Sequence, residues 1–335
     1  MRKLRLLPKQ AELLATEERC QMSRYILKRL ILAVLTLLVI VFVLFLMLQY
    51  MPGSPFNDEK LNAEQVAALK SKYGLDQPVY IRFFKYVSHM VRGDFGLSYN
   101  IQKNVPISSM IRGRLPVSIR LGAQAVLLGT LLGLVLGVMA ALWHNTFVDT
   151  LCTIVSVVGV SVPSFVFAFF LLYNLGFKAG LFPILYKVTL PVSSTILPTL
   201  ALSMFPLAQI ARFSRTEMLE VLGSDYMLFA ESKGLTSFRL HAVHALRNVL
   251  IPIITVLAPL IVSLMTGSMV IEKIFSVPGV GSLLVTAIQS NDYNVVVSLT
   301  FIYCVMYIGI MLVVDMLYGV IDPRIRLTKE NSHEG

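Results

Sequence analysis

Six long stretches of this chain contain no aspartate, glutamate, lysine or arginine, and they constrain its fold more than any other feature. Each contains an apolar core long enough to cross a bilayer, whose hydrocarbon layer of ~30 Å needs about 20 residues of helix. The stretches are rich in leucine and lack two-residue alternation, which argues against strands. They cover residues 30–57, 121–148, 150–177, 188–211, 249–271 and 293–314.

This pattern predicts an all-α polytopic membrane protein with six transmembrane helices. The composition agrees, because 56% of the residues are hydrophobic and only 14% are charged, whereas a soluble domain carries about 25% charged residues. This composition argues against a soluble globular enzyme. The predicted transmembrane helices are residues 24–51, 117–143, 150–176, 190–211, 249–271 and 293–320.

The remaining segments lie outside the membrane in this prediction. They are an N-terminal tail at 1–23, an insertion between the first two helices at 52–116, a loop at 212–248 and a C-terminal tail at 323–335. The first helix is interpreted as a retained span, because its apolar run exceeds the 7–15 residues typical of a signal peptide. The last five helices form a core over 117–322.

The basic residues indicate how the chain is oriented. Residues 1–29 hold eight Lys and Arg, the 212–248 loop holds five and the tail after Ile321 holds three, whereas the loops 178–187 and 272–292 hold two and one. Short loops rich in Lys and Arg stay in the cytoplasm, while long loops such as the insertion translocate largely regardless of charge. We therefore expect both termini and the 212–248 loop to be cytoplasmic, and the insertion to be extracytoplasmic.

A short helix is predicted inside the insertion. Asp76 can cap its start, Pro78 suits its first turn and Gly93 can end it.

The 212–248 loop carries helix signals rather than the composition of a flexible linker. Ser224 or Asp225 can start a helix that Gly234 ends in a left-handed conformation, and a second helix can begin at Thr236 or Ser237. The result is a helix–glycine–helix hairpin.

One face of the first hairpin helix combines aromatic and small residues, namely Tyr226, Phe229, Ala230 and Lys233. Such a helix suits insertion into a groove on another protein.

Two glycine patterns predict local structure in the membrane region. Gly129, Gly133 and Gly137 recur every four residues, which lets two helices approach closely in lipid. Pro278-Gly279 suits the centre of a tight turn after the fifth helix.

Several kinds of site have no signature in the sequence. There is no G-x-x-x-x-G-K-[ST] phosphate loop, so the chain cannot be its own ATPase. His89, His241 and His244 lack ligand spacing, so we assign no metal. No Ser/His or His/Asp/Glu constellation predicts an enzyme, and no cofactor is expected on this chain.

A series of short motifs carries a family resemblance through its order and spacing. The motifs are Arg24–Arg29, Pro52-Gly53, Gly74–Pro78, Gly93–Gly96, Ser161–Ser164, Asp225-Tyr226, Ala230–Gly234, His244–Asn248, Glu272–Gly281 and Ile321–Arg324. Over nearly all of 22–328 the chain resembles the membrane subunits of bacterial ATP-binding-cassette importers of the oligopeptide, dipeptide and nickel permease group. The resemblance is closest to the B-type oligopeptide permease subunits.

The resemblance implies a type I importer permease fold in the bacterial cytoplasmic membrane. In this family the cytoplasmic loop docks on the ATPase through a coupling helix whose pattern is Glu-Ala-Ala, three residues, then Gly. Counting back from Gly234, only Ala230 and Gly234 match, and Glu231 is out of register. The residues that we expect to couple to the ATPase are Asp225, Tyr226, Phe229, Ala230, Lys233, Gly234, Arg239, His244, Arg247 and Asn248.

The segment after the fifth helix has two interpretations. It can be a turn that only closes a helix pair, or, by the resemblance, it can contribute to an outer gate through Phe275, Pro278, Gly279 and Gly281.

The resemblance also implies partners and a function. The partners are a second homologous permease, two ATPase subunits that hold ATP and Mg²⁺, an extracytoplasmic peptide-binding protein and membrane lipids, with no nucleic acid. The leading function is ATP-driven import of oligopeptides, with dipeptides or nickel complexes as alternatives. An ion-coupled carrier is an alternative from another class, but the spans offer almost none of the ionisable groups that it needs.

Overall fold

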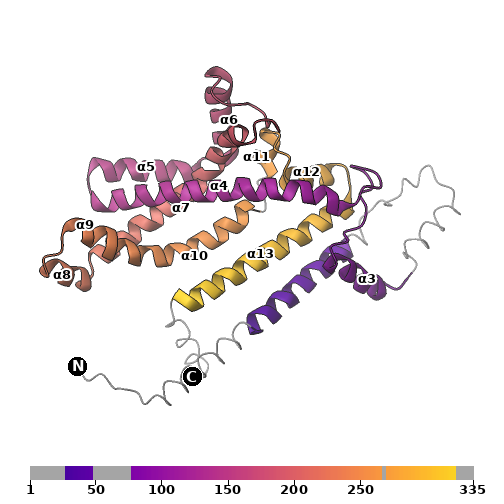
Figure 1. Ribbon diagram of the computed structural model, residues 1–335, viewed down its shortest axis with the longest axis horizontal. Coiled ribbons are helices and arrows are strands. Elements are labelled where there is room, and N and C mark those ends of the chain that lie inside the picture. Colours follow the sequence, from indigo (N-terminus) through magenta and orange to yellow (C-terminus); the bar gives the residue numbers. More distant parts are fainter. Residues whose placement is uncertain (1–26, 48–76, 266–268, 322–335) are drawn as a thin grey trace, which may run out of the picture. The chain divides into compact units, whose positions relative to one another are not determined.

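A computed structural model describes residues 27–47, 77–265 and 269–321 of the chain (Figure 1). The predicted tails at 1–23 and 323–335, and the insertion as far as residue 76, lie outside the described residues. The described chain is almost entirely helical. Its helices are Leu27–Met47, α3 (Val79–Val91), α4 (Ile107–Leu142), α5 (Phe147–Ser161), α6 (Ser164–Leu171), α7 (Pro191–Leu222), α8 (Asp225–Ser232), α9 (Ser237–Arg239), α10 (Leu246–Met265), α11 (Met269–Ile274), α12 (Val280–Gln289) and α13 (Tyr293–Ile321).

Two π-helical segments complete these elements. Leu172–Lys178 extends α6, and Leu240–Ala245 joins α9 to α10. The chain divides into two compact units, one formed by Met1–Gln49 with Cys304–Gly335 and the other by Tyr50–Tyr303. All the sites described below lie in the second unit.

Six candidate membrane spans are present among the described helices when each bent pair counts as one span. Four are single helices, at Leu27–Met47, Ile107–Leu142, Pro191–Leu222 and Tyr293–Val314. Two are bent pairs, Phe147–Ser161 with Ser164–Lys178 and Ser237–Leu250 with Pro252–Leu264. The predicted all-α polytopic fold is confirmed.

The third predicted helix, 150–176, is bent rather than continuous. Its two halves meet at an angle of 106°. Val162 has an extended backbone and Pro163 follows it, because a proline disfavours helical geometry in the residue before it and has no N–H to continue the hydrogen-bond ladder.

Two spans are longer than the charge pattern predicted. Helix α4 begins at Ile107 instead of 117, and α7 continues to Leu222 instead of ending at 211. The extra turns contain Arg112, Arg114, Arg212 and Arg215. Charged residues mark where the hydrocarbon layer ends, but a helix can continue through the headgroups into water.

Close contact between α4 and α7 organises the second unit. Gly129, Gly133 and Gly137 lie against the backbone of α7, so that a Cβ added at Gly133 would come within 2.6 Å of the Leu207 carbonyl oxygen. The glycines therefore let the two helix backbones touch, in the manner of small-xxx-small faces. Helix α5 packs on α7 in the same way through Gly159, which lies against Ala208.

The short helix predicted in the insertion is α3. Its N-cap is Pro78, and Gly93 follows its last turn with a φ of +79°. Asp76, the predicted capping residue, lies outside the described residues.

Candidate coupling loop and buried-carboxylate turns

The hairpin after α7 depends on one left-handed glycine. Helix α8 ends at Ser232, and Gly234 adopts a φ of +76° while its N–H donates to the Glu231 carbonyl over 2.8 Å. Thr236 precedes α9 as its N-cap in an extended conformation. Because left-handed backbone is unfavourable for residues with a Cβ, glycine suits this corner.

Helix α8 has one anchored face and one exposed apolar face. Met227 is buried and Ala230 packs with it in a cluster that includes Met218 of α7 and Val249 of α10. The opposite face leaves large hydrophobic side chains in contact with solvent, including Phe229 at 60% exposure and Phe238 of the neighbouring α9 at 78%. We call this exposed set the hairpin face; it comprises Tyr226, Leu228, Phe229, Phe238 and Val243.

Three contacts connect residues in and beside the hairpin face. The ammonium nitrogen of Lys233 lies 4.2 Å from the centroid of the Phe229 ring. The side-chain amide of Asn248 donates to the Tyr226 hydroxyl over 2.9 Å and to the His244 carbonyl over 3.2 Å. These contacts join five of the predicted coupling residues in two groups.

The remaining charged residues that were predicted to couple to the ATPase take no part in these contacts. Asp225, Arg239 and Arg247 are exposed and form no ion pair with another described residue. Three unpaired charges beside an apolar face resemble the polar rim of a protein interface.

The turn between α11 and α12 is tightly packed around a buried carboxylate. Glu272 accepts hydrogen bonds from the Ser118 hydroxyl and from the backbone N–H of Ser282, each over 2.7 Å. The Ser118 oxygen in turn accepts the N–H of Val280 over 2.9 Å. A Cβ at Gly279 would overlap the Glu272 carboxylate, so only glycine fits there.

This geometry favours a structural turn over an outer gate as the role of the segment that contains Phe275, Pro278, Gly279 and Gly281. Phe275 is buried, and both Gly279 and Gly281 lie against Glu272. The prediction missed Ser118 and Glu272. Their signal was an acidic residue directly after a predicted span, where an uncompensated charge is costly.

A second buried carboxylate ties the insertion to the start of α13. One oxygen of Asp292 accepts the Ser98 hydroxyl over 2.5 Å and the backbone N–H groups of Tyr99, Asn100 and Ile101 over 3.0–3.2 Å. Asp292 is fully buried and its carbonyl accepts the N–H of Val296, the first turn of the helix. The sequence signal was an aspartate just before an apolar helix.

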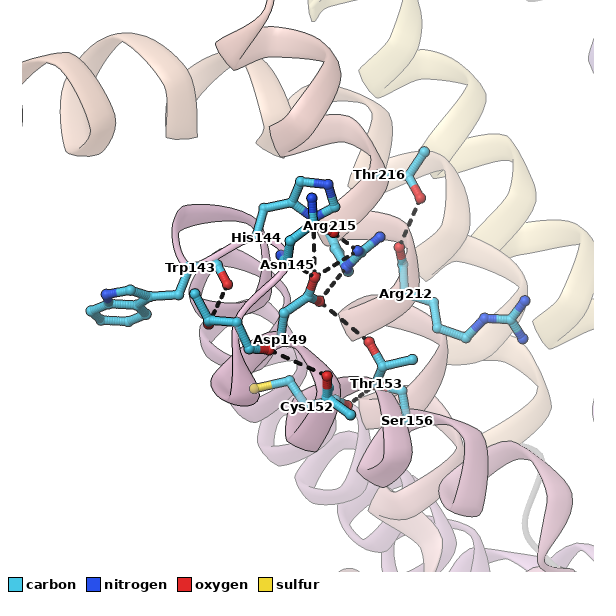
Figure 2. A network of polar contacts seen from close by, with 12 residues as sticks. Trp143, His144, Asn145, Asp149, Cys152, Thr153, Ser156, Arg212, Arg215 and Thr216 are labelled. Carbon is cyan, nitrogen blue, oxygen red and sulfur yellow. Dashed lines mark hydrogen bonds and ion pairs between the residues drawn. The ribbon is translucent and has the colours of Figure 1, made fainter.

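At the opposite end of the unit, an ion pair joins α5 to α7 (Figure 2). Arg215 donates to the two oxygens of Asp149 over 2.7 and 2.9 Å. His144 lies 3.0 Å from the same carboxylate, and the N–H of Asn145 donates to it over 3.0 Å. The carboxylate is nearly buried, so the cluster fixes the turn between α4 and α5 against α7.

Comparisons with known proteins bear on this geometry. Residues 133–327 match the family model described as binding-protein-dependent transport system inner membrane component, and residues 22–122 match the model of its N-terminal region. The chain is 47% identical to a dipeptide transport system permease protein of Lactococcus lactis and 41% identical to one of Bacillus subtilis. It is 38% identical to the oligopeptide transport system permease protein of Escherichia coli.

These alignments cover 91%, 92% and 91% of this chain, respectively, and the whole of each relative. Together the two family models span most of the sequence, including the turns around Glu272 and Asp292 and the hairpin. The resemblance carried by the short motifs is therefore confirmed, and the chain belongs to the family of inner membrane components of binding-protein-dependent transport systems.

Proposed function

We propose that this chain is the permease subunit of an ATP-driven peptide importer in the bacterial cytoplasmic membrane, and that the hairpin of α8 and α9 transmits ATPase closure to the spans. The observation that carries the proposal is the hairpin face. Its large apolar side chains are exposed at the end of a helix pair that is anchored to α7 and α10. A rigid apolar face of this kind fits a groove on a partner protein.

The direction of force transfer follows from the anchoring. Met227 and Ala230 connect α8 to Met218 near the cytoplasmic end of α7, and α7 lies against α4 through its glycine face. A displacement of the hairpin therefore moves α7 and α4 as packed bodies, because closely packed helices shift rather than deform.

The partners are those that such a system needs. A second homologous permease supplies the other half of the translocation path, two ATPase subunits bind ATP and Mg²⁺, and an extracytoplasmic binding protein delivers the peptide. Both termini and the hairpin are on the cytoplasmic side, as the distribution of Lys and Arg indicates.

The proposed substrate is a peptide. Oligopeptides are the leading candidate, and the names of two relatives support dipeptides as the second. The relatives at 47% and 41% identity are dipeptide permeases by name, whereas the relative at 38% is an oligopeptide permease. Oligopeptides remain the leading class from the sequence motifs, and dipeptides are the second candidate.

Transport by the reconstituted complex tests both the energy source and the substrate. The chain is placed in proteoliposomes with its second permease, its ATPases and its binding protein, and uptake of a labelled dipeptide and a labelled hexapeptide is measured with ATP and with a non-hydrolysable analogue. We expect uptake only with ATP, unchanged by an ionophore. Uptake that follows an imposed ion gradient without ATP would establish the ion-coupled carrier instead.

A further inference from the structure

A small cavity opens beside the Asp149–Arg215 pair at the end of the unit that carries the hairpin. Its volume is about 150 Å³, and it lies where α4, α5 and α7 converge. Its lining combines apolar residues of α4 with mostly polar residues of α5 and α7. The residues that matter here are Leu136 and Ala140 of α4, Thr153 and Ser156 of α5, and Arg212 and Thr216 of α7.

The two arginines beside the cavity differ in their electrostatic state. Arg215 is neutralised by its two hydrogen bonds to Asp149. Arg212 lies one turn earlier, is exposed, and its side chain has no carboxylate partner within the described part of the chain. Figure 2 shows its guanidinium extending away from the Asp149 cluster. The cavity therefore carries one uncompensated positive charge.

Two hydroxyl groups of the lining are left as hydrogen-bond acceptors. The Ser156 hydroxyl donates its proton to the Cys152 carbonyl over 2.8 Å, and the Thr216 hydroxyl donates to the Arg212 carbonyl over 3.1 Å. Each oxygen keeps free lone pairs but has no further proton to donate. A complementary ligand has an anionic group for Arg212 and hydroxyl donors for Ser156 and Thr216.

The position of the cavity along α7 places it at a membrane surface. Arg212 follows Pro191, the first residue of α7, by 21 positions, which at 1.5 Å per residue is about 32 Å and close to the ~30 Å hydrocarbon thickness. The adjacent turn exposes Trp143 at 50% and Phe147 at 80%. Aromatic side chains gather at the membrane–water interface, so the turn and the cavity share that level.

We infer that this cavity binds the headgroup of an anionic phospholipid of the phosphatidylglycerol type, with the phosphate on Arg212 and the glycerol hydroxyls on Ser156 and Thr216. Basic pockets between transmembrane helices on the cytoplasmic side suit such headgroups. A peptide carboxylate fits less well, because it brings charge but no hydroxyl donors. The assignment to the inner leaflet rests on the orientation given under the proposed function.

Native mass spectrometry of the purified full-length chain tests the inference. The detergent-solubilised protein is titrated with phosphatidylglycerol or with phosphatidylcholine, and the fraction with one bound lipid is measured. We expect the wild type to retain phosphatidylglycerol in preference to phosphatidylcholine. Arg212→Gln should weaken that preference about fivefold, the effect of one basic residue worth ~1 kcal/mol at an anionic surface, and Arg212→Lys should restore part of it.

The matched control is Arg239→Gln, which removes the same charge from the same side of the protein but away from the cavity; it should leave the preference unchanged. Equal losses in both variants would show general surface attraction and overturn the site. Retention of phosphatidylglycerol by Arg212→Gln would also overturn it. So would a short peptide that displaces the lipid from the wild type and binds through Arg212. Lipid retention needs neither ATPase nor uptake, so its failure is distinct from failure of the proposed transport function.

Discussion

The guanidinium of Arg215 and the carboxylate of Asp149 form a two-point ion pair that joins α7 to the first turn of α5. The carboxylate is nearly buried, while the guanidinium is about two-thirds buried. The pair lies between the glycine-packed α4–α7 contact and the hairpin, so it fixes the relative position of three helices at the end where coupling is proposed.

Removal of this ion pair should destabilise the protein. Arg215→Ala leaves Asp149 buried without its counter-charge, a change that costs about 3 kcal/mol in comparable buried pairs. Arg212→Ala removes an arginine one turn away that has no carboxylate partner in the described chain, so it should change stability little. Thermal unfolding of the two purified variants in the same detergent measures the difference. Equal unfolding temperatures would contradict a structural role for the pair.

The glycine face of α4 should not tolerate a methyl group. Gly133→Ala places a Cβ 2.6 Å from the Leu207 carbonyl oxygen, so α4 and α7 must separate, and overpacking of this kind costs about 1–3 kcal/mol. Gly113→Ala is the control, because it lies on the same helix with no atom near its Cβ. The folded fraction recovered from membranes should fall only for Gly133→Ala; a fall for both would indicate a general effect of α4 glycines.

The Asp292 carboxylate should keep residues 98–101 of the insertion in their folded conformation. Asp292→Ala leaves the N–H groups of Tyr99, Asn100 and Ile101 without their acceptor, which should increase local opening of that loop. Hydrogen exchange at residues 98–101 measures the effect, and protection should fall by at least tenfold. Gln289→Ala, at the exposed end of α12, should leave protection intact. Unchanged exchange in Asp292→Ala would show that other contacts hold the loop.

Gly234 and Gly223 offer a matched test of the hairpin corner. Gly234 has a φ of +76°, whereas Gly223 at the end of α7 has an ordinary φ of −81°. Gly234→Val should impose about 1–2 kcal/mol of backbone strain and reduce ATP-driven uptake at normal membrane levels. Gly223→Val, with no such strain, should transport better than Gly234→Val. Comparable uptake by both variants would mean that the corner geometry is not needed for coupling.

Most of the architecture could be predicted from the sequence, because a helix that crosses a bilayer needs a long stretch without charged residues. The charge-free runs predicted six spans. The ends of α4 and α7 were predicted wrongly, because both helices continue past arginines such as Arg112 and Arg212. Charged residues mark the edge of the hydrocarbon layer and not the end of a helix. The bend at Pro163 was visible only as a proline, which membrane helices often tolerate.

The site was predictable where it depends on local rules. Gly234 and Thr236 followed from capping, which acts within a few residues. Tyr226 and Phe229 are exposed as the helical spacing predicted, but Ala230, predicted on the same face, packs with the buried Met227. Glu272 with Ser118 and Asp292 with Ser98 pair across 154 and 194 positions, and a single sequence contains no pattern that links residues so far apart.

Binding of the ATPase to a variant of the hairpin face tests directly whether this face is the docking surface. Phe229→Glu places a charge in the middle of the exposed apolar face without disturbing the buried Met227. Phe84→Glu, at an aromatic residue that is 70% exposed on α3, introduces the same charge on the insertion instead of the hairpin. Co-purification of the ATPase subunits with each full-length variant is then measured, together with membrane level. We expect Phe229→Glu to lose the ATPase at least tenfold while Phe84→Glu retains it, and retention of the ATPase by Phe229→Glu would contradict docking through the hairpin face.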